Sequence, residues 1–404
     1  MGRPTPTFAL LLITTLVVSC RGEDMMSPGH QSATRTLNLE KTAGSQTRFV
    51  SVSAGSSHTC ALTSQGAAFC WGHSISNGQY GPSLVPAAVR GGHRFASVTT
   101  GTAHSCAVTH NGETYCWGWN EFGQLGTGSS VSMTIEPILV ADDLRFGSVT
   151  GSYGHTCGAT LSGAGYCWGL NHSGQLGDGT TIQRWIPTPI NGNLRFRLVS
   201  AGDNGIHTCG LTQDGKSYCW GLNGNGILGN EDAAINSTHT TPIPAAGSLR
   251  FISLEAGGNH NCGLTSGRAA YCWGHNSGGQ LGNGTSGWAT SGPTPVRVSG
   301  GLKFNEISAG SGHTCGVTVN HKAYCWGSNS YGELGIGAPD SDTHPEPLPL
   351  SGELEFRKIS AGSGHTCGVT TDQRIYCWGR NYIGQLGNGT TVDSPIPIPV
   401  AEPS

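Results

Sequence analysis

The chain has 404 residues, of which 65 are glycine and only 11% are charged, whereas ordinary soluble domains contain about 7% glycine and 25% charged residues. Because glycine costs about 1 kcal/mol at each helical position, this composition excludes most helical architectures and favours short strands joined by tight turns. The formal net charge of −3 and the pI near 6.6 exclude nucleic-acid binding through a basic stripe that releases counterions.

The first twenty residues have the pattern of an export signal. Arg3 precedes an apolar run from Phe8 to Val18, which is shorter than the ~20 residues that a membrane-spanning helix needs. The run ends in the sequence Val-Val-Ser-Cys, which resembles the lipobox of bacterial lipoproteins. Residues 1–20 are therefore predicted to be a lipoprotein signal peptide with Cys20 as the lipidated residue. Ordinary secretion and an uncleaved anchor are the alternatives.

The next segment bears on the final location of the protein. Arg21 stands where many inner-membrane lipoproteins have aspartate, so the outer membrane or the cell surface is the expected location, with secretion or the periplasm as the alternative. Residues 21–44 are polar and have no hydrophobic periodicity. Such a segment is typical of a flexible tether.

Fourteen of the fifteen cysteines form a regular series. They fall into seven pairs with nine residues between the partners, and the first cysteines of successive pairs lie 46, 51, 52, 53, 53 and 52 residues apart. Self-similarity at a period of about 50 residues is the signature of solenoids and propellers. The pairs are Cys60 and Cys70, Cys106 and Cys116, Cys157 and Cys167, Cys209 and Cys219, Cys262 and Cys272, Cys315 and Cys325, and Cys367 and Cys377.

Each repeat consists of short apolar runs separated by Gly, Pro and Asn clusters. In the best preserved repeat, from Phe356 to Val400, the runs are rich in β-branched residues and leave no helical stretch, which predicts about four strands. Four-stranded units that repeat seven times close into a propeller. Residues 45–404 are therefore predicted to form one all-β domain, a seven-bladed β-propeller of four-stranded blades.

The spacing of the first cysteine pair predicts the register of its hairpin. A three-residue loop, Ser64-Gln65-Gly66, places Cys60 opposite Cys70 at a non-hydrogen-bonded pair, where the two Cα atoms are closest. That geometry suits a disulfide. The same register places His58 opposite Gly72, whose missing side chain leaves room for the imidazole. Three later loops keep the residue count and therefore the register: Ser266-Gly267-Arg268, Val319-Asn320-His321 and Thr371-Asp372-Gln373.

Disulfides are the preferred interpretation of the seven cysteine pairs. Exported cysteines are usually oxidised, and although a His-x-Cys motif recurs in every repeat, no fourth zinc ligand recurs with it. Buried free thiols and a metal site are the alternatives. The recurring histidines are predicted to be packing residues that cap the hairpins: His58, His104, His155, His207, His260, His313 and His365.

Three motifs of each repeat resemble a known family. The elements SAGxxHTCxLT, YCWG and NxxGQLGxG, followed by a Pro-rich strand, are similar to the regulator of chromosome condensation repeat over residues 49–400. The resemblance implies a seven-bladed propeller. It does not select a function, because the family includes a nucleotide exchange factor on chromatin, a plant photoreceptor, modules of ubiquitin ligases and secreted bacterial inhibitors of β-lactamase.

The other repeated or charged features are interpreted structurally. The tryptophan of each Cys-Trp-Gly motif is predicted to be a core residue between blades rather than a light sensor. The motif NxxGQLGxG precedes a strand instead of a helix, so it predicts a turn rather than a phosphate site. The carboxylate pairs Asp142-Asp143 and Glu231-Asp232 are expected in solvated loops. The sequence therefore predicts no catalytic residue, no metal and no cofactor.

The differences between repeats indicate a binding surface. Insertions at 230–241, 284–292 and 338–344 fall at one point of the repeat, and variable loops on one rim are the usual binding surface of a repeat protein. Aromatic residues at non-repeating positions are predicted to lie on these loops and to bind a partner. The alternative is that they rigidify the rim. They are Trp119, Phe122, Trp185, Trp288, Tyr331 and Tyr382.

These observations predict a non-catalytic, macromolecule-binding propeller of the cell envelope, an inhibitor or a scaffold. A nucleotide exchange factor and an enzyme with a site in the propeller channel are the alternatives. The expected partner is a protein, without nucleic acid, and the expected membrane contact is the N-terminal lipid anchor alone. The chain is expected to be a monomer.

Overall fold

The computed structural model describes residue 2 and residues 46–73, 81–141, 143–202 and 205–403. Apart from residue 2, the predicted signal peptide, Cys20 and the predicted tether lie outside these residues. The strands begin at Phe49, within the unit Gln46–Ser404.

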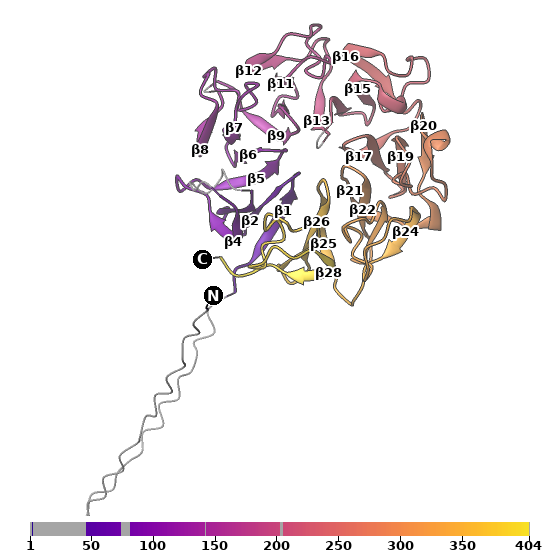
Figure 1. Cartoon of the computed structure of the whole chain (residues 1–404). Helices are drawn as coiled ribbons and strands as arrows, with labels where there is room; N and C mark the ends of the chain where they lie inside the picture. The colour runs from indigo at the N-terminus through magenta and orange to yellow at the C-terminus, as the bar shows by residue number, and fades with distance from the viewer. Residues whose placement is uncertain (1, 3–45, 74–80, 142, 203–204, 404) are drawn as a thin grey trace, which may run out of the picture. The chain divides into compact units, whose positions relative to one another are not determined.

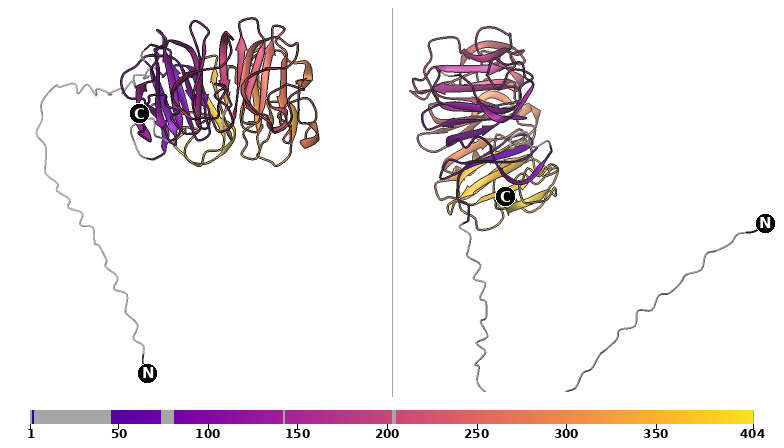
Figure 2. Two further views of the ribbon diagram at one scale, coloured as in Figure 1. Left: turned by 90° about the horizontal axis from the view of Figure 1, so that it is seen from above. Right: turned by 90° about the vertical axis from the view of Figure 1, so that its left-hand side faces the viewer.

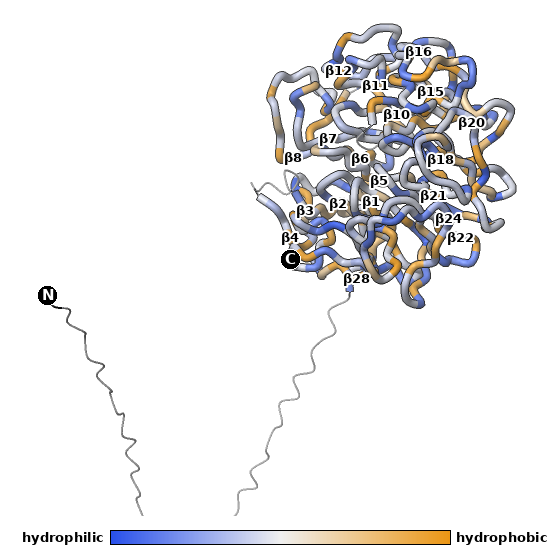
Figure 3. Tube along the Cα trace, turned by 45° about the vertical axis from the view of Figure 1, so that its right-hand side comes forward, coloured by the Kyte–Doolittle hydropathy of each residue, from blue (hydrophilic) through white to orange (hydrophobic). Residues whose placement is uncertain are grey.

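The described strands form seven antiparallel sheets of four consecutive strands each, arranged around a central axis (Figure 1). Within each sheet the strands are hydrogen-bonded in sequence order. Hydrophobic stretches, in orange, are interspersed with hydrophilic ones, in blue, around the whole ring (Figure 3). The predicted all-β, seven-bladed propeller is confirmed.

Each blade contributes one strand to each of four concentric positions. The innermost strands are β1 (Phe49–Ala54), β5 (Phe95–Thr100), β9 (Phe146–Gly151), β13 (Phe196–Ala201), β17 (Phe251–Ala256), β21 (Phe304–Ala309) and β25 (Phe356–Ala361). The second strands are β2 (His58–Thr63), β6 (His104–Thr109), β10 (His155–Thr160), β14 (His207–Thr212), β18 (His260–Thr265), β22 (His313–Thr318) and β26 (His365–Thr370).

The two outer positions complete the blades. The third strands are β3 (Ala68–Gly72), β7 (Thr114–Trp119), β11 (Gly165–Gly169), β15 (Ser217–Leu222), β19 (Ala270–Gly274), β23 (Ala323–Gly327) and β27 (Ile375–Gly379). The outermost strands are β4 (Ser83–Ala88), β8 (Met133–Leu139), β12 (Arg184–Pro189), β16 (Thr238–Ala245), β20 (Gly292–Arg297), β24 (His344–Pro349) and β28 (Ser394–Pro399). The short 3-10 helices are η1 (Gly224–Gly226), η2 (Trp288–Thr290) and η3 (Ser299–Gly301).

The cysteine hairpins have the predicted register. Cys60 lies opposite Cys70, and each of the seven pairs forms a disulfide with 4.1 Å between the Cα atoms. The third loop residue is left-handed even where it is not glycine, as at Arg268, His321 and Gln373, with φ of 64°, 63° and 70°. Loop length therefore preserves the turn.

The glycine opposite each histidine has a different role from the one predicted. A Cβ atom on Gly72 would lie 2.8 Å from the Cα atom of His58, so this glycine makes room for the histidine backbone. The imidazole points to the next blade, where His58 Nε2 lies 2.8 Å from Ser105 Oγ. The histidines thus connect blades instead of capping their own hairpins.

This histidine contact recurs at all seven blade junctions and forms a closed ring. In each case Nε2 lies 2.7–3.0 Å from a side-chain oxygen in the next blade. That oxygen belongs to the residue directly after the equivalent histidine of that blade. The pairs are His58 with Ser105, His104 with Thr156, His155 with Thr208, His207 with Asn261, His260 with Thr314, His313 with Thr366, and His365 with Thr59.

The direction of the five histidine–threonine hydrogen bonds follows from the threonine hydroxyl groups, each of which donates to a backbone carbonyl oxygen. Thr156 donates its single hydroxyl proton to the carbonyl oxygen of Gln124 at 2.8 Å, so it must accept from His104 Nε2. The neutral histidine therefore has its proton on Nε2. Its Nδ1 is buried and, within the described residues, has no partner. A proton added at Nδ1, which would make the histidine positively charged, would therefore have no hydrogen-bond acceptor.

Burial accordingly disfavours the charged form of the ring histidines. It lowers the pKa of His58, His155, His260 and His365 to about 3. It lowers the pKa of the others, His104, His207 and His313, to about 4. The fold therefore holds the whole ring neutral at pH 7.

The hydrophobic core is divided among the same junctions. The disulfide Cys209–Cys219 packs with Phe251 and Trp273 of the next blade. The repeated tryptophans are fully buried, which confirms their predicted place in the core: Trp71, Trp117, Trp168, Trp220, Trp273, Trp326 and Trp378.

The ring closes without exchanging a strand between its ends. The first blade packs on the last through Phe49 and Trp71, which lie in one cluster with Cys367 and Cys377. Phe49 N also donates to the carbonyl oxygen of Gln373 at 2.9 Å. The closing junction thus has the same kind of core as the other six.

We expect the propeller to lose stability in acid. The folded pKa of each ring histidine lies below its unfolded value of about 6.5, so the unfolded chain binds more protons. The stabilising contribution is complete above pH ~6.5 and is lost at roughly 1.4 kcal/mol per histidine and pH unit as the pH falls. Thermal melts should give a much lower melting temperature at pH 5 than at pH 7.5. Equal melting temperatures would contradict the neutral ring.

Candidate protein-binding surface

The two faces of the propeller carry different connections. One face, here called the loop face, carries the turns between first and second strands and the longer loops between third and fourth strands. The other, the hairpin face, carries the turns between second and third strands and the links between blades. Figure 2 shows the disc edge-on with connections on both sides. The insertions 230–241, 284–292 and 338–344 lie in or beside third-to-fourth-strand loops, as predicted.

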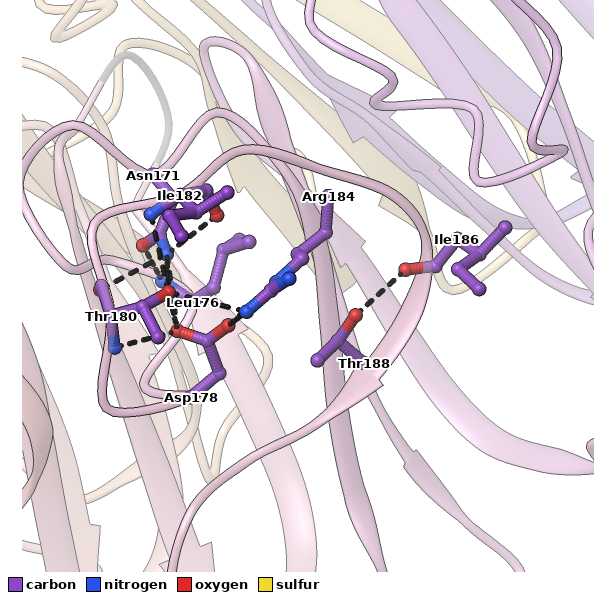
Figure 4. A network of polar contacts seen from close by, with 8 residues as sticks. All are labelled: Asn171, Leu176, Asp178, Thr180, Ile182, Arg184, Ile186 and Thr188. Carbon is purple, nitrogen blue, oxygen red and sulfur yellow. Dashed lines mark hydrogen bonds and ion pairs between the residues drawn. The ribbon is translucent and has the colours of Figure 1, made fainter.

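A buried asparagine organises each described loop between the third and fourth strands. In Figure 4, Asn171 Nδ2 donates to the carbonyl oxygens of Thr180 and Ile182 at 3.1 and 3.0 Å, and Oδ1 accepts from Leu176 N at 3.0 Å. The loop amides are thus used internally, as the turn interpretation of NxxGQLGxG requires. The equivalent residues are Asn120, Asn223, Asn276, Asn329 and Asn381.

In the third blade an ion pair lies beside the hydrogen bonds of the buried asparagine (Figure 4). Asp178 is almost fully buried, and its carboxylate lies 2.7 Å from Arg184 Nη2 and accepts from Thr180 Oγ1 at 2.7 Å. Burial raises the pKa of Asp178, but the hydrogen bonds from Thr180 and Arg184 outweigh that effect and hold the pKa below its usual value. Loops built this way are rigid supports for exposed side chains.

Four of the six predicted aromatic residues are exposed. The exposed fractions are 36% for Trp119, 70% for Trp288, 39% for Tyr331 and 52% for Tyr382. Trp288 begins the 3-10 helix η2, and the two tyrosines lie in loops. Trp119, by contrast, is the last residue of β7, so the prediction that it lies on a loop was wrong.

The other two aromatic residues brace neighbouring blades. Trp185 lies in β12 rather than on a loop, and a Cβ atom on Gly123 of the preceding blade would lie 2.9 Å from its indole. A Cβ atom on Gly154 would likewise lie 2.7 Å from the ring of Phe122. Both side chains are half-buried. For these two, the packing supports the alternative that they rigidify the rim.

Two residues missed by the sequence analysis join the exposed group. Arg380 lies between two rings, with Cζ 4.6 Å from the ring centroid of Tyr331 and 4.2 Å from that of Tyr382. Tyr153 is 44% exposed and lies 6.2 Å from Phe122. A sequence signal existed for Arg380, because the residue after Cys-Trp-Gly is uncharged or histidine in the other repeats.

A second unpredicted group lies on the innermost strands. Glu255, Glu306 and Lys358 come from consecutive blades, and Lys358 Nζ lies 3.4 Å from Glu306 Oε1. Burial raises the pKa of Glu255 to about 8, with a further contribution from Glu306, and raises the pKa of Glu306 to about 7. Glu255 replaces a serine or threonine that elsewhere accepts a backbone N–H of the next blade, as Ser200 does from Ala256.

These carboxyl groups hold protons near neutral pH. Their raised pKa values oppose the histidine effect, because the folded protein binds more protons at Glu255 and Glu306 than the unfolded chain does. The gain in stability that these two carboxyl groups give in acid is smaller than the loss caused by the seven histidines.

No group of three side chains that would hold a metal ion occurs among the described residues. Within the same ranges no helix is long and apolar enough to cross a membrane.

Comparison with protein families identifies the repeat. A family model described as the RCC1-like domain matches residues 14–303. The chain belongs to the RCC1-like domain family. Models of the regulator of chromosome condensation (RCC1) repeat also match the later RCC1-like blades, at residues 304–333 and 356–385 and at residues 320–369 and 372–404.

Relatives of this RCC1-like chain differ in how much of them it covers. The ultraviolet-B receptor UVR8 of Arabidopsis thaliana is 32% identical over 359 residues, which cover 86% of this chain and 80% of the receptor. The E3 ubiquitin-protein ligase HERC2 of Homo sapiens is 28% identical over 253 residues, 61% of this chain but 5% of the ligase.

Solved structures agree with the RCC1-like fold. Human WBSCR16 superposes with a TM-score of 0.71 and 20% identity, covering 79% of this chain and 85% of that one. Prp20p of Saccharomyces cerevisiae has the same score and identity and covers 88% of each chain. At this identity the likeness shows the fold alone.

We expect the Asp178–Arg184 pair to stabilise the RCC1-like propeller. Arg184→Ala leaves a buried carboxylate without its charged partner and should lower the free energy of unfolding by about 1–3 kcal/mol. The matched control is Arg374→Ala, whose partner Asp372 is 54% exposed, and which should cost less than about 0.5 kcal/mol. Urea unfolding of both variants measures the difference. Equal effects would reject the supporting role of the buried pair.

Proposed function

We propose that this chain is an exported, non-catalytic propeller that binds a protein partner through its loop face. One observation carries the proposal: exposed aromatic side chains stand on that face at positions where most other blades have a non-aromatic residue. Blade packing explains the buried tryptophans, but it does not explain Trp288 or Tyr382, which are 70% and 52% exposed. Exposed aromatic residues are typical anchors of protein interfaces.

The architecture and the relatives support a binding role. The asparagine-centred loops hold these side chains on a rigid scaffold, which lowers the entropy lost on association. Among proteins of the same fold, the structure report of Prp20p describes its binding to Gsp1p and histones. A protein partner for this chain, as an inhibitor or as a scaffold, agrees with that behaviour. The net charge of −3 disfavours a nucleic-acid partner.

The location of the protein is part of the proposal. Seven disulfides are expected in an oxidising compartment, and the sequence of residues 1–20 resembles a lipoprotein signal. We infer a monomer anchored to the outer membrane or cell surface through Cys20. This location separates it from cytoplasmic GTPases and disfavours the nucleotide exchange alternative.

A specific observation favours one second candidate, an enzyme with a site on the innermost strands. Carboxyl groups with raised pKa, such as Glu255 and Glu306, occur at catalytic sites as well as in structural ion pairs. Glu306→Gln separates the two functions. It should leave partner binding through the loop face unchanged, whereas an enzyme would lose its cellular effect while still binding.

The proposed surface can be tested before the partner is known. A photo-crosslinking phenylalanine analogue placed at Trp288 or Tyr382 should give a discrete crosslinked band in the native cell envelope. Leu161 and Val319 are matched controls, because they are 69% and 41% exposed on hairpin-face turns, and they should give no band. Crosslinks from the hairpin face alone would refute the assignment.

Binding measurements then separate interface from scaffold. With the captured partner purified, Trp288→Ala and Tyr382→Ala should each weaken binding at least about tenfold, the effect of truncating a hot spot of ~2 kcal/mol. Their melting temperatures should stay close to that of the wild type. The opposite pattern, a large drop in melting temperature with unchanged affinity, would show that these residues brace the rim.

Lipidation has its own test. We expect Cys20→Ser to release the protein into the soluble fraction, because the several acyl chains of a bacterial lipoprotein hold it in the membrane more firmly than one chain would. Fractionation of cell envelopes, with detection by antibody, measures the change. Identical fractionation of the variant and the wild type would show that Cys20 is not an anchor.

A further inference from the structure

Arg380 lies between two tyrosine rings on the loop face. Its guanidinium lies 4.2 Å from the ring centroid of Tyr382 and 4.6 Å from that of Tyr331. The group of Arg380, Tyr331 and Tyr382 is called the arginine clamp below. The tyrosines are 52% and 39% exposed, and Arg380 is half-buried. Contact with the rings restrains a side chain that otherwise loses much rotamer freedom on binding.

The cation in this clamp has no carboxylate partner. Within the described residues no carboxylate oxygen lies within 4 Å of Arg380, whereas Arg184 and Arg374 both form ion pairs with aspartates. A guanidinium that contacts rings keeps N–H donors along its edge. A carboxylate matches that planar edge with two parallel hydrogen bonds.

The nearby carboxylates of the same loops are already engaged. Glu333 is buried, and its carboxyl group accepts from Tyr331 N at 2.7 Å. Asp340 lies 2.9 Å from His344, and Asp393 accepts from Asn381 N at 2.6 Å. These contacts hold the three side chains within their own loops and leave the edge of Arg380 for a group from another molecule.

The clamp packs against the turn between β25 and β26. A Cβ atom on Gly364 would lie 3.4 Å from the ring of Tyr331 and 3.5 Å from Cδ of Arg380, so the clamp lies close to this turn. The preceding residue belongs to a chain of hydroxyl groups along four consecutive blades. Its links are Ser311 to Ser363 at 3.0 Å, Ser363 to Ser56 at 2.9 Å, and Ser56 to Thr102 at 3.1 Å.

We propose that the arginine clamp binds an aspartate or glutamate side chain in an acidic segment of the protein partner. The inference rests on the proposed function and names the partner's chemistry. Charge complementarity selects a carboxylate, and the exposed tyrosines supply the apolar contact that accompanies such an anchor in protein interfaces. A polyanion such as single-stranded DNA is disfavoured, because one arginine on a chain of net charge −3 neutralises too little of its backbone.

A defined probe tests the clamp without the natural partner. The probe is a fluorescein-labelled peptide with four glutamates spaced by Gly-Ser, and its counterpart has glutamine in place of glutamate. Fluorescence anisotropy with the full chain should show saturable binding of the glutamate peptide only. Arg380→Ala should weaken binding at least about tenfold. Arg380→Lys should weaken it severalfold, because an ammonium group cannot form the two parallel hydrogen bonds that the planar guanidinium forms with a carboxylate.

Matched variants separate the clamp from general charge. Arg374→Ala is the control, because Arg374 also lies over a tyrosine ring, Tyr376 at 5.7 Å, but already has Asp372 as its partner. This variant and Tyr331→Phe should bind within about twofold of the wild type, whereas Tyr382→Ser should lose affinity. Circular dichroism melts confirm that each variant is folded.

Three results would overturn the inference. They are equal binding of both peptides, binding of the glutamate peptide that is unaffected by Arg380→Ala, and binding of a twelve-nucleotide oligo-dT probe that depends on Arg380 while the peptide does not bind. A dimer of the wild type that Arg380→Ala dissociates in light scattering would instead assign the clamp to a second copy of the chain. If crosslinks from Tyr382 persist while the peptide test fails, the clamp is wrong and the loop-face function stands.

Discussion

The fold depends on one contact repeated around the ring, in which Nε2 of a neutral histidine of one blade is hydrogen-bonded to a side-chain oxygen of the next. The same hydroxyl, as at Thr156, donates to the backbone of the preceding blade's loop. Each link therefore requires both neighbours to be in place. Because the closing pair, His365 with Thr59, has the same geometry as the rest, the chain ends need no exchanged strand to complete the ring.

This constraint explains where the molecule varies. The cysteine hairpin, tryptophan and histidine of every blade face another blade, so their replacement would disturb two repeats at once. The loops between third and fourth strands are held at their base by a buried asparagine, but their outer residues are exposed to solvent. They admit insertions and singular residues such as Trp288 and Arg380 at little cost to the junctions. The binding surface is thus expected where the repeat is least restrained.

Much of this architecture is predictable from the sequence because it is local. The interval between Cys60 and Cys70 contains a complete hairpin, so counting residues yields the register, and seven equal intervals yield the blades. The direction of the histidine side chains is not local. It depends on how strands about fifty residues apart in the sequence lie next to each other. The spacing within one repeat therefore predicted that each histidine caps its own hairpin, whereas in the structure it is hydrogen-bonded to the next blade.

The same limit applies to the candidate sites. Trp119 and Trp185 depart from the repeat in sequence, but repeat spacing does not show where the neighbouring strands begin and end, and both residues lie in strands, β7 and β12, instead of loops. Glu255, Glu306 and Lys358 are far apart in the sequence, and only the closed ring brings their strands together. Arg380 likewise lies between tyrosine rings of two different blades, and only the folded chain brings Tyr331 next to it.

The central claim is that a rigid propeller binds its partner on the loop face alone. Hydrogen exchange of the full chain, measured by mass spectrometry with and without the captured partner, tests this most directly. The account predicts added protection at residues 275–291, 328–343 and 380–393, with the blade strands unchanged. Protection confined to the hairpin-face turns or to the outermost strands would contradict it.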